Sequence, residues 1–210
     1  MKAYGQNSED LRLKEYFEGE DSSSLTILDI GANDGRTFSN SLLAIEMGWN
    51  ACLIEPSPKA LEKLTGEHNG NNRVHIFPYA ITKFTGQATF YESGTLINQG
   101  DVALVSTLNA AEKTRWKDAN IQFDSTTVKC KTFADFMVDS QIKRFDAISI
   151  DCEGEDLNVL KQMDLAGLGC RFLIVEFNGH DQNMYEIYAN YFGMKLIHTN
   201  AENLIFTMPK

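Results

Sequence analysis

The amino-acid sequence predicts an α/β fold, in which a mostly parallel, twisted sheet carries helices on both faces and ends in a C-terminal antiparallel hairpin. The first observation is that short apolar segments, typical of buried strands, alternate with segments of helical periodicity. Repeated strand–helix units of this kind build parallel sheets. The second observation is that 195–199 and 204–207 have strand character and a short polar turn between them, which requires an antiparallel strand.

The expected elements follow one another regularly along most of the chain. In the first half, strands are expected at 25–30, 51–54 and 74–77, with helices at 37–47 and 58–68. In the second half, helices at 133–139, 155–163 and 181–191 alternate with strands at 147–150 and 172–175. More exposed strands are expected at 87–92 and 126–130, separated by an irregular stretch with a short helix at 110–116.

The length and the middle segment bound the domain organisation. A chain of 210 residues fits a single domain, 1–210, around one core. We interpret 87–130 as an inserted excursion that faces the substrate, because loops on a rigid scaffold commonly carry specificity. The exposed edge strand at 87–92 can pair between subunits, so a homo-oligomer is compatible with the sequence.

The composition excludes several classes of protein. The formal net charge is −10 and the isoelectric point about 4.8, and such an acidic surface repels phosphate backbones, so nucleic acid is not the expected partner. None of the four cysteines forms a C-x-x-C pair, which predicts buried thiols in a reducing compartment. The N-terminus has no apolar signal region, and no stretch approaches the roughly 20 apolar residues of a transmembrane segment. We therefore expect a cytoplasmic protein.

The first motif is the segment DIGANDG at 29–35, between the first strand and the next helix. In open α/β sheets, ligands bind beyond the carboxyl ends of the strands, and Gly31 and Gly35 would let a ligand approach the backbone closely. Asn33 stands where a dinucleotide fingerprint has a glycine. Asp29 and Asp34 would repel a pyrophosphate but suit a ligand that carries an ammonium and a sulfonium. A tight turn without a ligand is the alternative interpretation.

A second acid, Glu55, directly follows the second predicted strand and precedes Pro56. An acid at this position, roughly 20 residues after the glycine loop, can accept hydrogen bonds from both hydroxyls of a ribose. Proteins that bind NAD and proteins that bind S-adenosylmethionine share such an acid, so Glu55 alone does not distinguish the two cofactors. The alternative is a carboxylate that stabilises the helix N-terminus near Ser57.

Acids also follow the strands predicted at 147–150 and 172–175. In DCEGED at 151–156, Asp151 and Glu153 share one face if the strand continues, whereas Glu155 and Asp156 are expected to begin the next helix. Crowded carboxylates are costly unless they meet protons, cations or substrate hydroxyls. After the later strand, Glu176, Asn178 and His180 are candidates to join the same cleft.

At this point the residues match a known family. The chain resembles the FkbM-type methyltransferases, a branch of the class I S-adenosylmethionine-dependent enzymes, in four segments that run in the family's order: YGQNSED at 4–10, DIGANDG at 29–35, EPSP at 55–58 and IDCEGE at 150–155. The resemblance implies a Rossmann-like class I methyltransferase fold, bound S-adenosylmethionine, and methyl transfer to a hydroxyl of a sugar, glycolipid or natural product. The acceptor would then be a small molecule or a glycan.

The resemblance also implies roles for single residues. It makes 1–24 an N-terminal segment that closes the cofactor site, and it assigns cofactor binding to Gln6, Asp10, Asp29, Gly31, Asn33, Gly35, Glu55, Pro56, Ala80 and Asp151. Within this set, Glu55 would bind the ribose, Ala80 the adenine and Asp151 the methionine moiety. Glu153 would face the acceptor.

The chemistry requires a base, because an alcohol is a poor nucleophile at neutral pH. Glu153 is the first candidate, with Asp151 and His180 as alternatives. A divalent metal on Asp151 and Glu176 would also lower the pKa of a hydroxyl, and oxygen ligands suit Mg²⁺, but we do not favour a metal.

Two rival functions stay open. An NAD-dependent oxidoreductase would need a glycine in place of Asn33. A non-catalytic Rossmann-like binding module would have no physical reason to keep acids at four separate strand ends.

Overall fold

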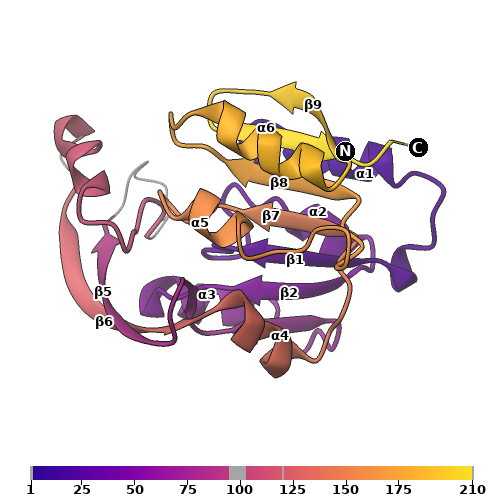
Figure 1. Cartoon of the computed structure of the whole chain (residues 1–210). Helices are drawn as coiled ribbons and strands as arrows, with labels where there is room; N and C mark the ends of the chain where they lie inside the picture. The colour runs from indigo at the N-terminus through magenta and orange to yellow at the C-terminus, as the bar shows by residue number, and fades with distance from the viewer. Residues whose placement is uncertain (1, 95–102, 120, 210) are drawn as a thin grey trace.

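The computed structural model describes residues 2–94, 103–119 and 121–209 (Figure 1). Its central sheet has seven strands in the order β3-β2-β1-β7-β8-β10-β9. The strands are β1 (Thr26–Ile30), β2 (Asn50–Ile54), β3 (Val74–Phe77), β7 (Ala147–Ile150), β8 (Phe172–Glu176), β9 (Lys195–Thr199) and β10 (Asn203–Thr207). β10 runs antiparallel to its neighbours β8 and β9, and the other neighbouring pairs of this sheet are parallel. The predicted parallel sheet with a C-terminal antiparallel hairpin is therefore confirmed.

Helices cover both faces of this sheet. One hydrophobic cluster contains side chains of α1 (Glu9–Tyr16), α2 (Leu42–Glu46) and α3 (Pro58–Glu67). The cluster on the other face contains side chains of α4 (Phe133–Ser140), α5 (Asp156–Leu160) and α6 (Gln182–Tyr191). Along β1, Ile27 packs into the first cluster, and Leu28 and Ile30 pack into the second, following the two-residue period of a strand. Burial on both faces explains the continuous apolar runs in the sequence.

A second, smaller sheet leaves the main domain between β3 and α4. It has the order β4-β6-β5, formed by β4 (Ala80–Ile81), β5 (Gly86–Ser93) and β6 (Phe123–Lys131). Figure 1 shows β5 and β6 on the side of the central sheet where α5 begins, which is the side of the carboxyl ends of the parallel strands. The short helix predicted at 110–116 is instead two 3₁₀ turns, η2 (Glu112–Thr114) and η3 (Lys117–Ala119). Residues 95–102 and 120 of the predicted excursion lie outside the described residues.

The helix predicted at 37–47 begins only at Leu42, so its predicted start was wrong. Polar side chains explain the difference. The carboxylate of Asp34 accepts hydrogen bonds from the backbone N–H groups of Arg36 and Thr37 at 2.9 and 2.7 Å, and Ser39 Oγ accepts from the Leu42 N–H at 3.1 Å. Such local bonds compete with helical ones. The residues between β1 and α2 therefore form a long loop, and this loop lies at the candidate site.

Two further expectations concern the whole chain. None of the helices in the described part of the chain is long and apolar enough to cross a membrane. All four cysteines are free thiols, with Cys52, Cys130 and Cys170 buried, as the sequence predicted.

Candidate active site

A cavity of about 520 Å³ opens at the carboxyl ends of the parallel strands. Its wall brings together most of the residues that the sequence singled out, from segments far apart in the chain. They are Gln6, Asp29, Gly31, Asn33, Glu55, Pro56, Ala80, Asp151, Glu153 and Glu176. The excursion contributes residues on both sides of its undescribed part, including Phe90, Val105, Arg115 and Trp116.

The loop after β1 is held very close to the end of β7. Gly31 has φ +91°, and a Cβ on it would lie 1.7 Å from the carbonyl oxygen of Asp151. No other residue fits there, because a side chain would overlap with the backbone of the neighbouring strand. Two residues further on, Asn33 has φ 47°, and its backbone N–H points at Glu55 Oε2 over 2.9 Å.

Glu55 is nearly fully buried at the end of β2, and backbone groups hold both of its oxygens. Oε2 accepts from the Asn33 N–H, and Oε1 accepts from the Ser57 N–H at 2.7 Å. Each oxygen keeps a lone pair for a further donor. Burial, assisted by the charges of Asp151 and Asp29, raises the pKa of Glu55 to about 7, although the two backbone hydrogen bonds oppose this. The carboxylate therefore both fixes the start of α3 and faces the cavity.

Asp29 lies deeper, on β1, in a network of hydroxyl groups. Ser41 Oγ donates to Asp29 Oδ2 over 2.6 Å, and Ser149 is the register partner of Asp29 on β7. Burial raises the pKa of Asp29 to about 6. The Nδ2 group of Asn40 donates to Ser149 Oγ over 3.2 Å, which extends the network to the cavity wall.

Three carboxylates at the carboxyl ends of β7 and β8 form a tight cluster. One oxygen each of Asp151, Glu153 and Glu176 lies within 4.8 Å of the others. Burial and the charge of Asp151 raise the pKa values of Glu153 and Glu176 well above the usual range for glutamate. Arg115 opposes this for Glu153, since its Nη2 lies 2.9 Å from Glu153 Oε2. The cluster therefore exchanges protons at far higher pH than exposed carboxylates do.

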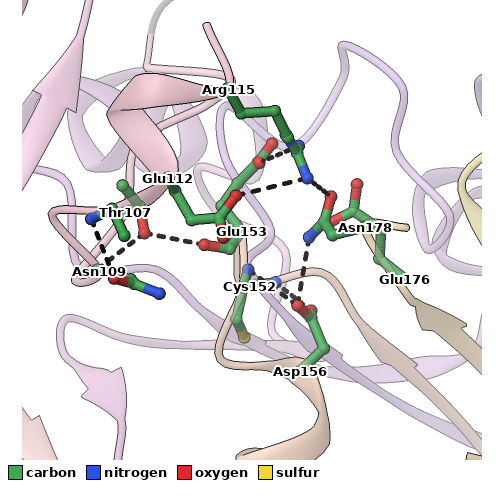
Figure 2. Close-up of polar contacts among 11 residues, drawn as sticks. Thr107, Asn109, Glu112, Arg115, Cys152, Glu153, Asp156, Glu176 and Asn178 are labelled. Carbon is green, nitrogen blue, oxygen red and sulfur yellow. Dashed lines mark hydrogen bonds and ion pairs between the residues drawn. The ribbon is translucent and has the colours of Figure 1, made fainter. Parts of the chain in front are cut away.

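Figure 2 shows the Arg115 guanidinium between Glu112 and Glu153 on one side and Asn178 on the other. Asn178 accepts from Arg115 through Oδ1 and donates through Nδ2 to Glu176 Oε2 over 2.5 Å. One amide thus joins the loop after β8 to the excursion. Arg115, Asn178 and Glu176 all line the cavity, so this contact joins parts of its wall that are distant in sequence.

Asp156 fixes the loop that carries Asp151 and Glu153. It is fully buried at the start of α5, and its carboxylate accepts from the N–H groups of Cys152 and Gly154 over 2.6 and 3.0 Å. Burial and the charge of Asp151 raise its pKa to about 7. The sequence predicted its place at the helix start but not this second role.

Three predicted site residues do not line the cavity. Asp10 is fully buried and accepts from the N–H groups of Tyr4 and Leu11, so it shapes the N-terminal turn. Gly35 has φ +75°, and a Cβ on it would lie 2.6 Å from a methyl of Leu64, so α3 rather than a ligand requires this glycine. His180 is exposed beyond the cavity wall, and the structure gives no support to its role as a base.

Sequence reasoning missed Glu9, which is fully buried. Its Oε1 accepts from the side-chain amides of Asn200 and Asn203 over 2.7 and 2.9 Å, and its Oε2 accepts from the Asn7 N–H over 2.9 Å. Glu9 thereby fastens the N-terminal turn, which carries Gln6, to the turn between β9 and β10. An acid in the first turn of a helix looks like an ordinary dipole contact, so no sequence signal distinguishes Glu9 from its neighbour.

The fold and this site define a class of protein. A sheet of this strand order, with a glycine loop after β1, an acid after β2 and carboxylates after β7, is that of the Rossmann-like class I methyltransferases. The chain belongs to the FkbM methyltransferase family, because the model of the methyltransferase FkbM domain matches residues 29–197. A search of curated proteins found no match.

Solved structures agree with this fold. The methyltransferase FkbM from Methylobacillus flagellatus KT has a TM-score of 0.54 at 16% identity; the match covers 91% of this chain and 46% of that one, so this chain spans less than half of that protein. A precorrin-6y C5,15-methyltransferase from Geobacter metallireducens GS-15 has a TM-score of 0.51 at 12% identity, and the match covers 98% of this chain and 88% of that one. The METTL16 MTase domain has a TM-score of 0.57 at 9% identity, and the match covers 98% of this chain and 68% of that one. At these identities the likeness shows the fold alone.

Proposed function

We propose that this protein transfers the methyl group of S-adenosylmethionine to a hydroxyl of a sugar, a glycolipid or a natural product. The supporting observation is that the carboxylates of Asp151, Glu153 and Glu176 share one cavity with the cofactor-type features at Gly31 and Glu55. A base beside an acceptor hydroxyl is what methylation of an alcohol requires. The net charge of −10 favours a small molecule or a glycan over a nucleic acid as the acceptor.

The residues of the cavity fit this cofactor chemically. The cavity has a volume of about 520 Å³, which lies within the usual range for cofactor sites. Glu55 offers two oxygens to the ribose hydroxyls, and Asp29 and Asp151 offer negative charge to a ligand that carries an ammonium and a sulfonium. Ala80 provides a small apolar surface for the adenine. When bound, S-adenosylmethionine supplies a methyl group activated by the positive charge of its sulfur.

Glu153 is the residue that we assign to the proton transfer. As the new carbon–oxygen bond forms and the carbon–sulfur bond breaks, the acceptor hydroxyl loses its proton to the Glu153 carboxylate. Arg115 favours the ionised form of this carboxylate, because its guanidinium at 2.9 Å partly opposes the effect of burial on the pKa. Asp151 raises the pKa of Glu153 in turn, which strengthens it as a base. A divalent metal held by Asp151 and Glu176 would also lower the pKa of the acceptor hydroxyl, but we do not favour it.

Thermal unfolding with S-adenosylhomocysteine, with NAD and without ligand tests the cofactor. At about 100 times the dissociation constant, a ligand adds roughly 2.7 kcal/mol to the stability, which is on the order of 5 °C for a domain of this size. We expect a shift with S-adenosylhomocysteine alone. A shift with NAD alone would establish an oxidoreductase instead, and no shift with either would favour a non-catalytic module.

A panel of hydroxyl, amine and carboxylate acceptors, assayed with methyl-labelled S-adenosylmethionine, tests the reaction. We expect labelled methyl ethers. For the acceptor so identified, Glu153→Gln should lower kcat by about 10²- to 10⁴-fold, the usual contribution of a general base, with S-adenosylhomocysteine affinity unchanged. Labelled amines or esters alone would refute methyl transfer to a hydroxyl.

A further inference from the structure

Glu153 has a backbone conformation that glutamate rarely adopts. Its φ is +49°, in the left-handed region, and Asn33 and Asn178 in the same cavity wall have φ +47° and +48°. Asparagine tolerates this region, whereas a longer side chain is disfavoured there. Such a residue persists only where its surroundings hold it, and residues of this kind cluster at functional sites. The contacts that hold Glu153 therefore decide the shape of this part of the cavity.

The conformation also decides where the carboxylate of Glu153 lies. Strand β7 ends at Ile150, so the two-residue period of a strand does not place Glu153 on the same side as Asp151. The chain turns at Glu153 instead, and one oxygen of its carboxylate lies within 4.8 Å of an oxygen each of Asp151 and Glu176. A different backbone conformation at Glu153 would move the candidate base away from this cluster.

Two side chains of the excursion hold Glu153, one at each end of the residue. Thr107 Oγ1 donates to the carbonyl oxygen of Glu153 over 2.8 Å, and Arg115 Nη2 lies 2.9 Å from its carboxylate (Figure 2). The backbone N–H of Asn109 donates to Thr107 Oγ1 over 2.9 Å. The hydroxyl hydrogen is therefore left for the carbonyl oxygen, which can only accept.

Thr107 is itself held firmly in the excursion. Its backbone exchanges two hydrogen bonds with Tyr91 on β5, of 2.9 and 3.0 Å. The residue is fully buried, and its neighbours Ser106 and Leu108 line the cavity, whereas Thr107 does not. The Thr107 hydroxyl therefore reaches Glu153 from behind the cavity wall.

We propose that Thr107 is a positioning residue for the methyl transfer, whose hydroxyl holds Glu153 in the conformation that presents its carboxylate to the acceptor. Because Thr107 is buried behind the wall, it acts through Glu153 and not by touching the acceptor or the cofactor. The segment that faces the acceptor thus also places the base. This inference rests on the proposed function.

Crystal structures of Thr107→Val and Thr107→Ser test the placement without an acceptor. Valine has nearly the shape of threonine but no hydroxyl, whereas serine keeps the hydroxyl. In Thr107→Val we expect the Glu153 carboxylate to leave its 2.9 Å contact with Arg115, and in Thr107→Ser we expect the contact to stay. Thr107→Ala, which removes the hydroxyl without a second methyl, is the alternative if the valine variant does not fold. Glu153 unchanged in the variant without the hydroxyl would overturn the proposal.

A double-mutant cycle measures the effect on the reaction, with the acceptor found in the panel. Thr107→Val should lower kcat at least about tenfold, because a misplaced base is inefficient, with S-adenosylhomocysteine affinity within twofold. Thr107→Ser should stay within threefold of the unchanged protein. In the Glu153→Gln protein, Thr107→Val should lower kcat less than twofold further, because no base is left to position. The matched control is Thr127→Val, an exposed threonine on β6, which should change neither kcat nor affinity.

Equal losses of kcat from Thr107→Val in both backgrounds would overturn the proposal, because Thr107 would then not act through Glu153. A loss in Thr107→Ser with an unchanged thermal unfolding midpoint would overturn it as well. If Glu153→Gln keeps full kcat, the base and its positioning residue both fail, although methyl transfer stands. If the unchanged protein methylates no hydroxyl, the proposed function fails, and the crystal structures still decide whether Thr107 holds Glu153.

Discussion

Replacing Glu55 by glutamine tests how the protein holds a buried acid at the candidate ribose site. Burial raises the pKa of Glu55 from 4.5 to about 7. The folded protein therefore binds this proton more tightly than the unfolded chain does. The resulting stabilisation is complete below pH 4.5 and is lost as the pH rises through 7.

The structure sets the size of the effect. A pKa difference of this size corresponds to about 3 kcal/mol, at roughly 1.4 kcal/mol per pH unit. Most of the loss, about 2 to 3 kcal/mol, falls between pH 5 and pH 8. Glutamine does not titrate, so its contribution to the free energy of unfolding does not change with pH. It also gives up one of the two hydrogen bonds from Asn33 and Ser57, but that cost is the same at every pH.

Urea unfolding of both proteins at pH 5, 6, 7 and 8, without ligand, measures this difference. We expect Glu55→Gln to gain about 2 to 3 kcal/mol relative to the unchanged protein between pH 5 and pH 8. Taking the difference between the two proteins removes the contributions of the buried acids that do not interact with Glu55. Glu62→Gln, an exposed carboxylate on α3, is the matched control. A difference that stays constant with pH would refute the argument that Glu55 is held as a buried acid.

Three further predictions follow from single contacts. Gly31→Ala puts a methyl 1.7 Å from the Asp151 carbonyl oxygen and should abolish folding; a native circular dichroism spectrum would contradict this. Glu9→Ala leaves the side-chain amides of buried Asn203 and half-buried Asn200 without this acceptor and should cost about 2 to 3 kcal/mol in urea unfolding; a loss below about 1 kcal/mol would show that the contact is dispensable. His180→Ala should change S-adenosylhomocysteine affinity less than twofold by calorimetry, and a tenfold loss would place this exposed residue back in the site.

Acids that directly follow a buried strand were predictable from the sequence. Asp151, Glu153 and Glu176 meet because parallel strands end at the same edge of a sheet, and apolar runs are enough to locate those ends. Arg115 was not predictable in this way. Its position depends on how the irregular excursion folds back over the cavity, and no periodic pattern encodes that path.

Similar residues in one motif also took different roles, which spacing alone could not separate. Gly31 and Gly35 both have positive φ, yet the first is needed beside the backbone of β7 and the second beside a side chain of α3. Likewise, Glu9 and Asp10 are both buried, but only Glu9 reaches the turn between β9 and β10. These roles depend on packing between elements.

The contact between Glu9 and Asn203 joins residues 194 positions apart. During synthesis, the N-terminal turn emerges from the ribosome long before the hairpin that holds it. A nascent chain can therefore pair β1, β2 and β3 early, but it cannot fasten the turn that carries Gln6 until residue 203 has left the exit tunnel. Closing so long a loop is also entropically costly, so this corner should form late in refolding. The wall of the cavity that contains Gln6 and Glu202 should therefore be completed late.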